Sequence, residues 1–472
     1  MVSLGWIRYR KGMEESVMKK PVQLCILIIL LVLFLSQYSA AEHWEKVVSN
    51  GFGDPANDYA WSMKPFKGKL YIGTINWLKG GEIWCSPTGE AGDWQRVYSA
   101  RSRTMAGIRN LYNDNDKALY ACTADTTGAE ILRTTDGRRW STVKRGGENR
   151  DNIAFRGITR FGEYLYAGGG EIKAQLYRSN NGLNWDRVDT RSNFESTKVL
   201  DPNTGEMITN NIMIGELAVF RDQLYAFTWT GGVDYRVIIE RAFGYEKIDM
   251  PSRSRSQASA SPGAFEVWRS SNGLEWEKVV GKDDPYGNGM GFCLRDPEGL
   301  ANVGVTSVLT YKGQLYVGTA NDHTHCSIWR TSDGTRWTKV VNFFDLGEKA
   351  DYYVWRMIEF QDRLFAGVMN MGPSADPAIT GAQIWASDSG DPGTFYNLVH
   401  NGFDGETWSD GAGIEIPKNG GVRSFGIFNG TLYAGTATIL SVLIPQEKLD
   451  GSEGRISIAG KDIGCEVWKL VQ

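Results

Sequence analysis

Apolar and polar residues alternate with a period of two in a segment that recurs along the chain. "VWRSSNGLEWEKV" (Val267–Val279) returns as "IWRTSDGTRWTKV" (Ile328–Val340). Alternation of this kind predicts a strand half-buried on one face, and Asn-Gly or Asp-Gly between two such runs predicts a hairpin. The first half recurs as EIWCS, EILRT, QLYRS, EVWRS, SIWRT, QIWAS and EVWKL. The second half recurs as DWQRV, RWSTV, NWDRV, EWEKV, RWTKV and, more loosely, FYNLV.

Two more strand-like segments precede each copy. One reads KLYIGT, ALYACT, YLYAGG, QLYAFT, QLYVGT, RLFAGV or TLYAGT, and the segment before it ends in an aromatic residue and a tight turn. Each unit is therefore a meander of four strands, and the chain contains seven units. Repeats of this length and composition predict an all-β fold, a seven-bladed β-propeller of four-stranded blades.

The two ends of the chain complement each other. The last unit stops at EVWKLVQ without a fourth strand, whereas HWEKV (His43–Val47) has no strand before it. We therefore expect the N-terminal segment to supply the outer strand of the C-terminal blade, which removes two exposed sheet edges.

Residues 1–41 resemble a secretory signal, with a start at Met18, a basic pair, an apolar run and small residues before residue 42. We expect a secreted or periplasmic protein whose residues 42–472 form one propeller domain without a membrane span; an uncleaved anchor is the alternative. The formal net charge is −4, and removal of the signal makes it more negative. A nucleic-acid partner, which requires a basic surface, is not expected. We expect a monomer.

Five cysteines remain after the signal, and an oxidising compartment favours disulfides. We predict a Cys293–Cys326 bridge, with Cys85–Cys122 as a second pair. His323 and His325 beside Asp322 form the one histidine cluster, but no further ligand pattern accompanies them. We expect no metal and no cofactor.

The turn sequences carry a resemblance to a known family. "RTSDGTRW" and "RTTDGRRW" resemble the Asp-box, or BNR, repeat of sialidase-like propellers (S-x-D-x-G-x-x-W), with one residue fewer between Asp and Gly, and "LYAGGG" is similar to Kelch repeats. In that family the Asp-box is a structural turn. The resemblance therefore implies the propeller fold, but hydrolases, lyases and binding proteins share this fold, so it implies no activity. The repeated tryptophans are expected to fill the gaps between blades; they are Trp44, Trp94, Trp140, Trp185, Trp276 and Trp337.

The long insertions all belong to the loops of one face, which predicts that this face binds a ligand. Alignment of the units places a group of large polar and aromatic residues near the start of the innermost strands: Trp61, Arg109, Arg156, Glu216, Trp355, Arg356 and Arg423. Planar guanidinium groups suit carboxylate or sulfate. The alternative is that the arginines pair with loop acids and fill the channel; the candidate acids are Asp125, Glu171, Asp234 and Asp322.

Two functions remain open. The first is a binding propeller that recognises a glycan, another anionic ligand or a protein partner. The alternative is a carbohydrate-active enzyme, a glycoside hydrolase or uronate lyase on an acidic saccharide, with Tyr59, Tyr352, Tyr353 or Glu216 as nucleophile or base. The chain lacks the F-R-I-P signature of sialidases. The residues near the start of the innermost strands differ from blade to blade, which favours one central site rather than a repeated one. Of the two functions, we expect a binding protein.

Overall fold

The structure is a computed structural model, and its described residues are 42–146, 152–171, 173–200, 205–230, 265–281, 285–288, 302–321, 325–348, 350–370, 380–409, 415–438 and 462–472. The predicted signal, residues 1–41, lies outside them. The chain divides into two compact units. Lys46–Lys469 holds the blades, and Met1–Glu45 with Leu470–Gln472 forms the smaller unit. No helix among the described residues has the length and apolar character needed to cross a membrane.

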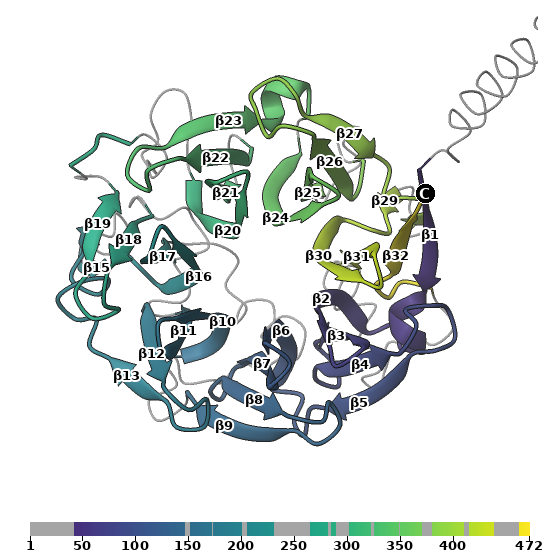
Figure 1. Cartoon of the computed structure of the whole chain (residues 1–472). Coiled ribbons are helices and arrows are strands. Elements are labelled where there is room, and N and C mark those ends of the chain that lie inside the picture. Colours follow the sequence, from purple (N-terminus) through teal and green to yellow (C-terminus); the bar gives the residue numbers. More distant parts are fainter. Residues whose placement is uncertain are drawn as a thin grey trace, which may run out of the picture. The chain divides into compact units, whose positions relative to one another are not determined.

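Within Lys46–Lys469 the strands form four-stranded antiparallel blades that follow one another around a ring, as predicted (Figure 1). Blades 1 and 2 contain β2 (Asn57–Phe66), β3 (Lys69–Asn76), β4 (Glu82–Ser86), β5 (Gln95–Ser99), β6 (Met105–Asp114), β7 (Ala118–Asp125), β8 (Glu130–Thr134) and β9 (Ser141–Arg145). Blades 3 and 4 contain β10 (Asn152–Phe161), β11 (Tyr164–Glu171), β12 (Gln175–Ser179), β13 (Asp186–Val188), β16 (Met213–Phe220), β17 (Gln223–Trp229), β18 (Val267–Ser270) and β19 (Glu277–Val280).

Blades 5 and 6 contain β20 (Asn302–Tyr311), β21 (Gln314–Asn321), β22 (Ser327–Thr331), β23 (Thr338–Asn342), β24 (Asp351–Phe360), β25 (Arg363–Asn370), β26 (Gln383–Ser387) and β27 (Tyr396–Val399). Blade 7 contains β30 (Gly421–Phe428), β31 (Thr431–Ala437), β32 (Val467–Val471) and the N-terminal β1 (His43–Val48), because β1 pairs with β32. The predicted closure is confirmed. The 3-10 turns η1 (Asn50–Gly53) and η4 (Phe343–Leu346) lie between strands.

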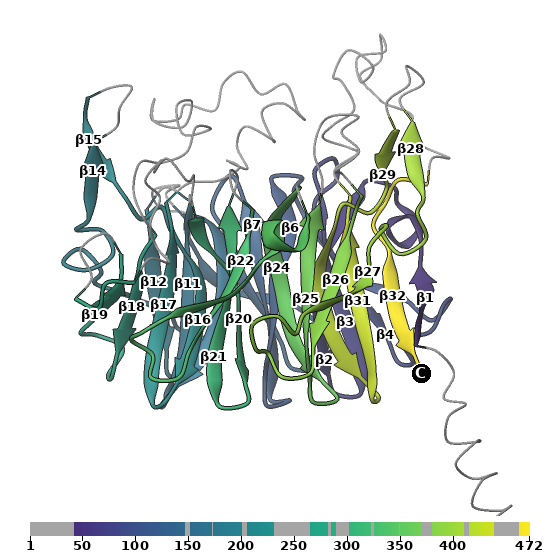
Figure 2. The same cartoon turned by 90° about the horizontal axis from the view of Figure 1, so that it is seen from above.

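Two inserted hairpins leave the blades on the same side. They are β14 (Lys198–Leu200) with β15 (Met207–Thr209), and β28 (Thr407–Ser409) with β29 (Glu415–Pro417). Figure 2 shows both hairpins beyond one end of the blade strands, whereas the opposite end carries short turns. These two insertions agree with the predicted elaborated face. The long loop expected between Trp229 and Gly263 lies almost wholly outside the described residues.

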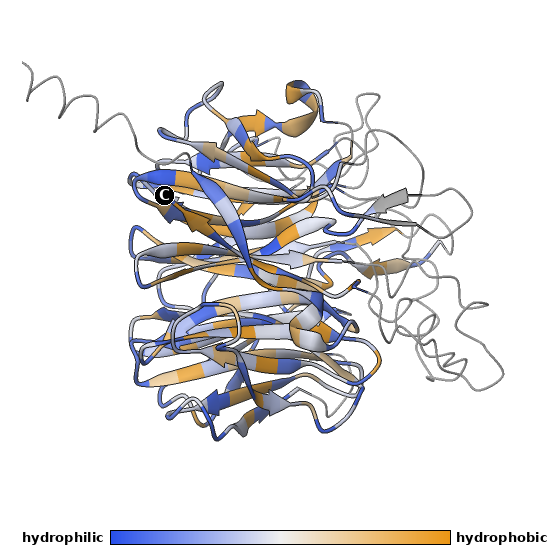
Figure 3. Cartoon of the chain, turned by 90° about the vertical axis from the view of Figure 1, so that its right-hand side faces the viewer, coloured by the Kyte–Doolittle hydropathy of each residue, from blue (hydrophilic) through white to orange (hydrophobic). Residues whose placement is uncertain are grey.

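The hydrophobic core lies between neighbouring blades. One cluster, for example, joins Phe66, Tyr71 and Ile83 of blade 1 to Ile108 and Leu119 of blade 2. Figure 3 shows hydrophobic positions spread along the strands, with hydrophilic colour concentrated at the turns. The repeated tryptophans pack in or against these clusters as predicted, which the structure shows for Trp94, Trp140, Trp185, Trp276 and Trp337.

The Asp-box-like turns have the predicted structural role. In blade 2, Asp136 Oδ1 accepts hydrogen bonds from the backbone N–H groups of Arg138 and Arg139, at 2.9 and 2.8 Å. Asp333 of blade 5 accepts the same pair of bonds, at 2.8 and 2.9 Å. A side chain that satisfies two backbone donors fixes the hairpin without a ligand.

The predicted disulfides are wrong. Cys85, Cys122, Cys326 and Cys465 are buried free thiols. Cys85 packs in the core between blades 1 and 2, whereas Cys122 packs between blades 2 and 3, so the two sulfurs belong to different clusters. Cys326 is enclosed by the core of blades 5 and 6, and Cys293, its predicted partner, lies outside the described residues. Burial raises the pKa of Cys122 and Cys326, which keeps both thiols protonated and unreactive.

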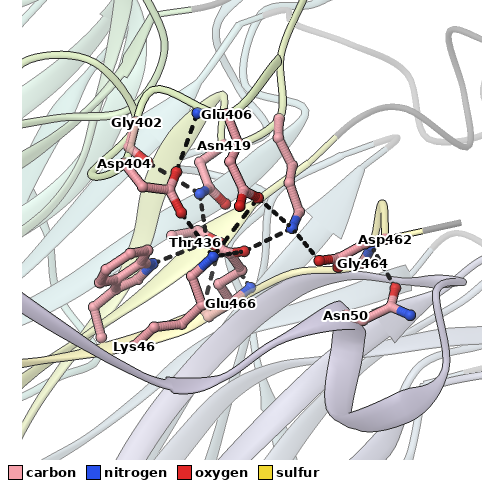
Figure 4. Close-up of polar contacts among 12 residues, drawn as sticks. Lys46, Asn50, Gly402, Asp404, Glu406, Asn419, Thr436, Asp462, Gly464 and Glu466 are labelled. Carbon is pink, nitrogen blue, oxygen red and sulfur yellow. Dashed lines mark hydrogen bonds and ion pairs between the residues drawn. The ribbon is translucent and has the colours of Figure 1, made fainter. Parts of the chain in front are cut away.

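Blade 7 is held by an ion cluster around the buried Glu466, between its own strands and the loop before it (Figure 4). Glu466 is fully buried, and its Oε1 lies 2.8 Å from Lys46 Nζ of β1 and 2.7 Å from Lys418 Nζ. Lys46 also pairs with Asp404 at 2.7 Å, and Lys418 pairs with Glu406 at 3.0 Å. The carboxylates of Asp404, Glu406 and Glu466 lie within 4.8 Å of one another, and each pairs with at least one of the two ammonium groups. The cluster therefore ties the N-terminal strand to blade 7.

Replacement of Lys46 by Met should lower the free energy of unfolding by about 1–3 kcal/mol, because Glu466 stays buried with one cation fewer. Urea denaturation measures this change. Lys339→Met is the matched control, since Lys339 occupies the corresponding position of blade 5, where Ser327 replaces the glutamate and Lys339 lies over Trp329. An equal loss in both variants would show that the ion cluster does not hold the closure.

Candidate functional site

Every innermost strand contains a β-bulge at the same place. The register of β2 against β3 skips one residue between Ala60 and Ser62, so that Trp61 is the extra residue, and the other innermost strands skip in the same way. The bulged residues are Trp61, Arg109, Arg156, Gly215, Thr306, Trp355 and Arg423. A bulge bends the strand and redirects the side chain of the extra residue. Most of the predicted site residues thus owe their direction to this bulge, and the other two, Glu216 and Arg356, directly follow it.

The bulges lie deeper than the sequence predicted. Trp61 is the fifth residue of β2, and Arg109, Arg156 and Trp355 have the same place in β6, β10 and β24. The residues that were expected near the strand starts therefore form a layer about half-way along the strands. We call Arg109, Arg156, Arg356 and Arg423 the arginine layer.

Each bulge is anchored by the blade before it. The residue two positions ahead of the bulge pairs with the second strand of the preceding blade, as Tyr59 does with Ala437 and Gly107 does with Ile75. The remaining pairs of this kind are Ala154–Ala124, Met213–Gly170, Gly304–Trp229, Tyr353–Ala320 and Gly421–Met369. These bridges join all blades into one continuous 28-stranded sheet and fix the height of the arginine layer.

Aromatic rings cover the cations of adjacent blades. The Arg423 guanidinium carbon lies 5.2 Å from the centre of the Trp355 ring and 5.8 Å from that of Trp61. Arg109 lies 4.8 Å from the Trp61 ring, so this indole has an arginine on either side in the order of the blades. Tyr59 contacts both tryptophans, with ring centres 6.0 and 5.8 Å apart. A cation near an aromatic face is stabilised by the ring quadrupole, and more strongly when water is excluded.

Glycines leave room for these rings. A Cβ atom on Gly107 would lie 2.5 Å from the Trp61 ring, and one on Gly421 would lie 2.3 Å from the Trp355 ring. Each indole therefore crosses onto the innermost strand of the next blade, which brings Trp61 over Arg109 and Trp355 over Arg423.

Arg356 and Arg156 have carboxylate partners. Arg356 Nη1 donates to Glu216 Oε1 at 2.7 Å, and Arg156 Nη1 lies 3.6 Å from Glu171 Oε1. Arg156 also contacts Met213 Sδ and lies over the Trp229 ring. Of the acids expected to neutralise the arginines, Glu171 does so, Asp125 instead accepts from Thr127, and Asp234 and Asp322 lie outside the described residues.

The charges of the layer strongly perturb one another. Burial lowers the pKa of Arg423 well below its usual value, and the positive charges of Arg356, Arg109 and Arg156 lower it further. Burial also lowers the pKa of Arg109 to about 10, although Glu171 opposes the shift. The positive charges of the other three arginines thus act on Arg423. A region where buried positive charges repel one another attracts an anion.

The tyrosines and histidines suggested for catalysis or metal binding have other environments. Burial raises the pKa of Tyr59 above its ordinary value, and the negative charge of Asp58 adds to this shift. His325 stacks on Phe344, with ring centres 5.0 Å apart, and on Tyr352, at 6.0 Å. Its predicted companions Asp322 and His323 lie outside the described residues. Tyr353 stacks on Trp355.

A recurring polar clasp escaped the sequence analysis. In blade 1, Asn57 Nδ2 donates to the Gly51 carbonyl oxygen at 2.8 Å and to Glu82 Oε2 at 3.0 Å. Asn211 with Glu266 and Asn419 with Glu466 repeat the arrangement in blades 4 and 7. A tryptophan two residues after each glutamate donates to the same carboxylate. The repeated glutamate in EIWCS, EVWRS and EVWKL is the sequence signal of this arrangement.

Blade 6 departs from the clasp at the start of the strand that carries Trp355 and Arg356. Asp351 occupies the asparagine position and is fully buried; Asn370 Nδ2 donates to its Oδ1 at 2.7 Å, and its Oδ2 has no hydrogen-bond partner among the described residues. Burial raises the pKa of Asp351 to about 8, Asn370 opposes the shift, and the charge of Glu348 adds to it. Asp351 is thus a neutral acid near pH 7.

Comparison with known proteins finds similarity to solved structures at low sequence identity. No family model matches the chain, and no curated protein matches it. The chain is similar in structure to Sqt1 of Saccharomyces cerevisiae, with 11% identity, a TM-score of 0.42 and coverage of 91% of this chain and 99% of that one. It is also similar to a protein from Lactobacillus plantarum, with 10% identity, a TM-score of 0.43 and coverage of 77% and 86% respectively.

Asp351→Asn should make the protein more stable at alkaline pH. The folded-state pKa of about 8 lies above the usual value of 3.8, so the folded protein retains a proton that the unfolded chain loses. The contribution of this group is therefore fully present below pH 3.8 and is lost as the pH rises through about 8. We expect the variant to gain about 1–3 kcal/mol over the wild type at pH 9 and to lose most of this advantage at pH 5.

Urea unfolding at both pH values measures the effect of Asp351→Asn. Asp362→Asn serves as the control, because the Asp362 side chain is 79% exposed and its removal should leave the pH dependence unchanged. If the difference in the free energy of unfolding between Asp351→Asn and the wild type is the same at both pH values, Asp351 is not a neutral acid in the folded protein.

Proposed function

We propose that this chain is a secreted or periplasmic binding propeller whose arginine layer receives the carboxylate of an anionic ligand, such as an acidic glycan. The observation that carries the proposal is the environment of Arg423. This guanidinium is 6% exposed, lies between two tryptophans, and makes no ion pair with a carboxylate of the described residues. A bound anion would relieve its repulsion by the other three arginines.

The surroundings of Arg423 favour a ligand with both charge and a flat face. The guanidinium fork can bind both oxygens of a carboxylate, which a lysine ammonium cannot do. Trp61, Trp355 and Tyr59 supply apolar ring surface beside the charge. A sugar ring that carries a carboxylate combines the two features.

An enzymatic role receives less support. Glu216, the carboxylate that would act as base, is held by Arg356, and the raised pKa of Tyr59 disfavours the phenolate that a nucleophile requires. The Asp-box-like turns, which carry the resemblance to sialidase-like propellers, satisfy their own backbone and support the fold rather than a reaction. We therefore favour binding without turnover.

Arg423→Lys should weaken the binding of glucuronate by about 1–3 kcal/mol, the range for hydrogen bonds to charged groups, because lysine keeps the charge but loses the fork. Isothermal titration calorimetry measures the affinity, with glucose as the uncharged reference. Arg139→Lys is the control, since the Arg139 side chain is 93% exposed. A lower melting temperature with unchanged affinity would mean that Arg423 only fills the channel.

A further inference from the structure

We propose that Glu216 is an internal competitor of the ligand: in the unliganded protein it occupies Arg356, and the ligand's carboxylate displaces it. This inference rests on the proposed function. It assigns to one residue the control of affinity, and it defines the ligand's anionic group as a carboxylate, because that is the group Arg356 already holds.

The Arg356–Glu216 ion pair joins two blades that are not neighbours in the ring. Glu216 belongs to blade 4 and Arg356 to blade 6, so their side chains meet in front of the innermost strand of blade 5. The same Arg356 Nη1 lies 3.4 Å from the carbonyl oxygen of Thr306, the bulged residue of blade 5. Both bonds that Arg356 makes to described residues use Nη1. The other edge of the guanidinium therefore has no partner among those residues.

The corresponding positions of other blades show that Glu216 is not needed to join blades. The residue after the bulge is Ser62, Ser307 or Ser424 in blades 1, 5 and 7. Ser62 Oγ donates to the Ile108 carbonyl oxygen of the next blade at 2.9 Å, and Ser424 Oγ donates to Ala60 O at 2.6 Å. Ser307 Oγ accepts from the Met357 N–H at 2.8 Å.

Short hydroxyl side chains at this position thus link adjacent blades. Glu216 instead passes its neighbour and reaches a cation two blades away. Glu216 is longer than serine, carries a charge and meets an arginine of the arginine layer. These features indicate a role at the site rather than in the fold.

The pair is placed where exchange is possible. The side chains of Arg356 and Glu216 are 20% and 11% exposed, whereas those of Arg156 and Glu171 are 8% and 6% exposed. Of the two pairs, Arg356–Glu216 is therefore the one a solute reaches with less rearrangement. A carboxylate that replaces Glu216 restores the bond to Arg356, and the displaced glutamate regains solvent. The cost of displacement lowers the observed affinity of the wild type.

The test compares Glu216→Gln and Glu216→Ser with the wild type in calorimetric titrations at constant ionic strength. The probes are glucuronate, sulfate and glucose. Serine reproduces the residue of three other blades, which protects the fold, and glutamine keeps the shape of glutamate. We expect glucuronate to bind about five- to tenfold more tightly to Glu216→Gln and at least as tightly to Glu216→Ser, since the competing carboxylate is gone. Sulfate should gain less, and glucose should not respond.

Glu82→Gln is the matched control. Glu82 is also a buried, ion-paired glutamate, but its partners Asn57, Trp84 and Arg96 belong to the clasp of blade 1. This variant should lose stability without a change in affinity. If both Glu216 variants bind glucuronate no more tightly than the wild type, and their melting temperatures equal that of the wild type, Glu216 does not compete with the ligand.

The outcomes separate this inference from the proposed function. If wild type binds glucuronate and Arg423→Lys weakens that binding while the Glu216 variants do not tighten it, the binding site stands and the competitor fails. If neither wild type nor the Glu216 variants bind glucuronate, both ideas fail. A larger gain for sulfate than for glucuronate would contradict the carboxylate assignment.

Discussion

The interaction on which the candidate site depends is a single backbone pairing ahead of each bulge. The residue two positions before the bulge is bonded to the preceding blade, and the strand then accommodates an extra residue against its own partner strand. The first contact fixes the strand against its neighbour, and the second turns a side chain out of the ladder. Because every blade repeats both features, the six side chains of the bulged residues other than Gly215 are presented at one level without any loop holding them.

This constraint explains how a propeller keeps several arginines in its interior. A buried guanidinium is costly unless it is paired or covered. The chain uses both solutions: carboxylates approach Arg156 and Arg356, and indole rings cover Arg109 and Arg423. The rings fit because glycine stands where the next blade would otherwise collide with them. The buried arginines of the site therefore depend on the packing of the aromatic rings that cover them.

The sequence predicted the architecture well because local sequence patterns determine each strand and turn of the blades. Period-two alternation and Asp-Gly or Asn-Gly turns recur in each unit, and the incomplete units at the two ends predicted the pairing of β1 with β32. Alignment of equivalent strand positions also identified residues that meet in space, such as Trp61, Trp355 and Arg423. Residues at equivalent positions of the innermost strands lie at the same level, so the alignment alone supports that inference.

What escaped the sequence depends on three-dimensional neighbours. A bulge leaves no mark on the alternation of a strand that is buried on both sides, so the depth of the layer was misjudged. The partners of Cys85 and Cys122 were assigned from adjacent blades, although the two sulfurs face different interblade cores. Asp351 looks like any acid at a strand start, and its buried position is evident only beside the asparagines of the other blades.

The contrast between repeated and unrepeated residues gives the strongest argument about function. Turn residues, clasp residues and interblade tryptophans recur because each blade faces the same physical problem, and their recurrence needs no ligand. At the bulge the blades face the same geometry as well, yet they carry tryptophan, arginine, glycine and threonine in no repeating order. Packing alone would favour one solution in every blade. The variation at a position of constant geometry is what a single asymmetric ligand at the axis would require, and it is confined to the level where the charges of the chain converge.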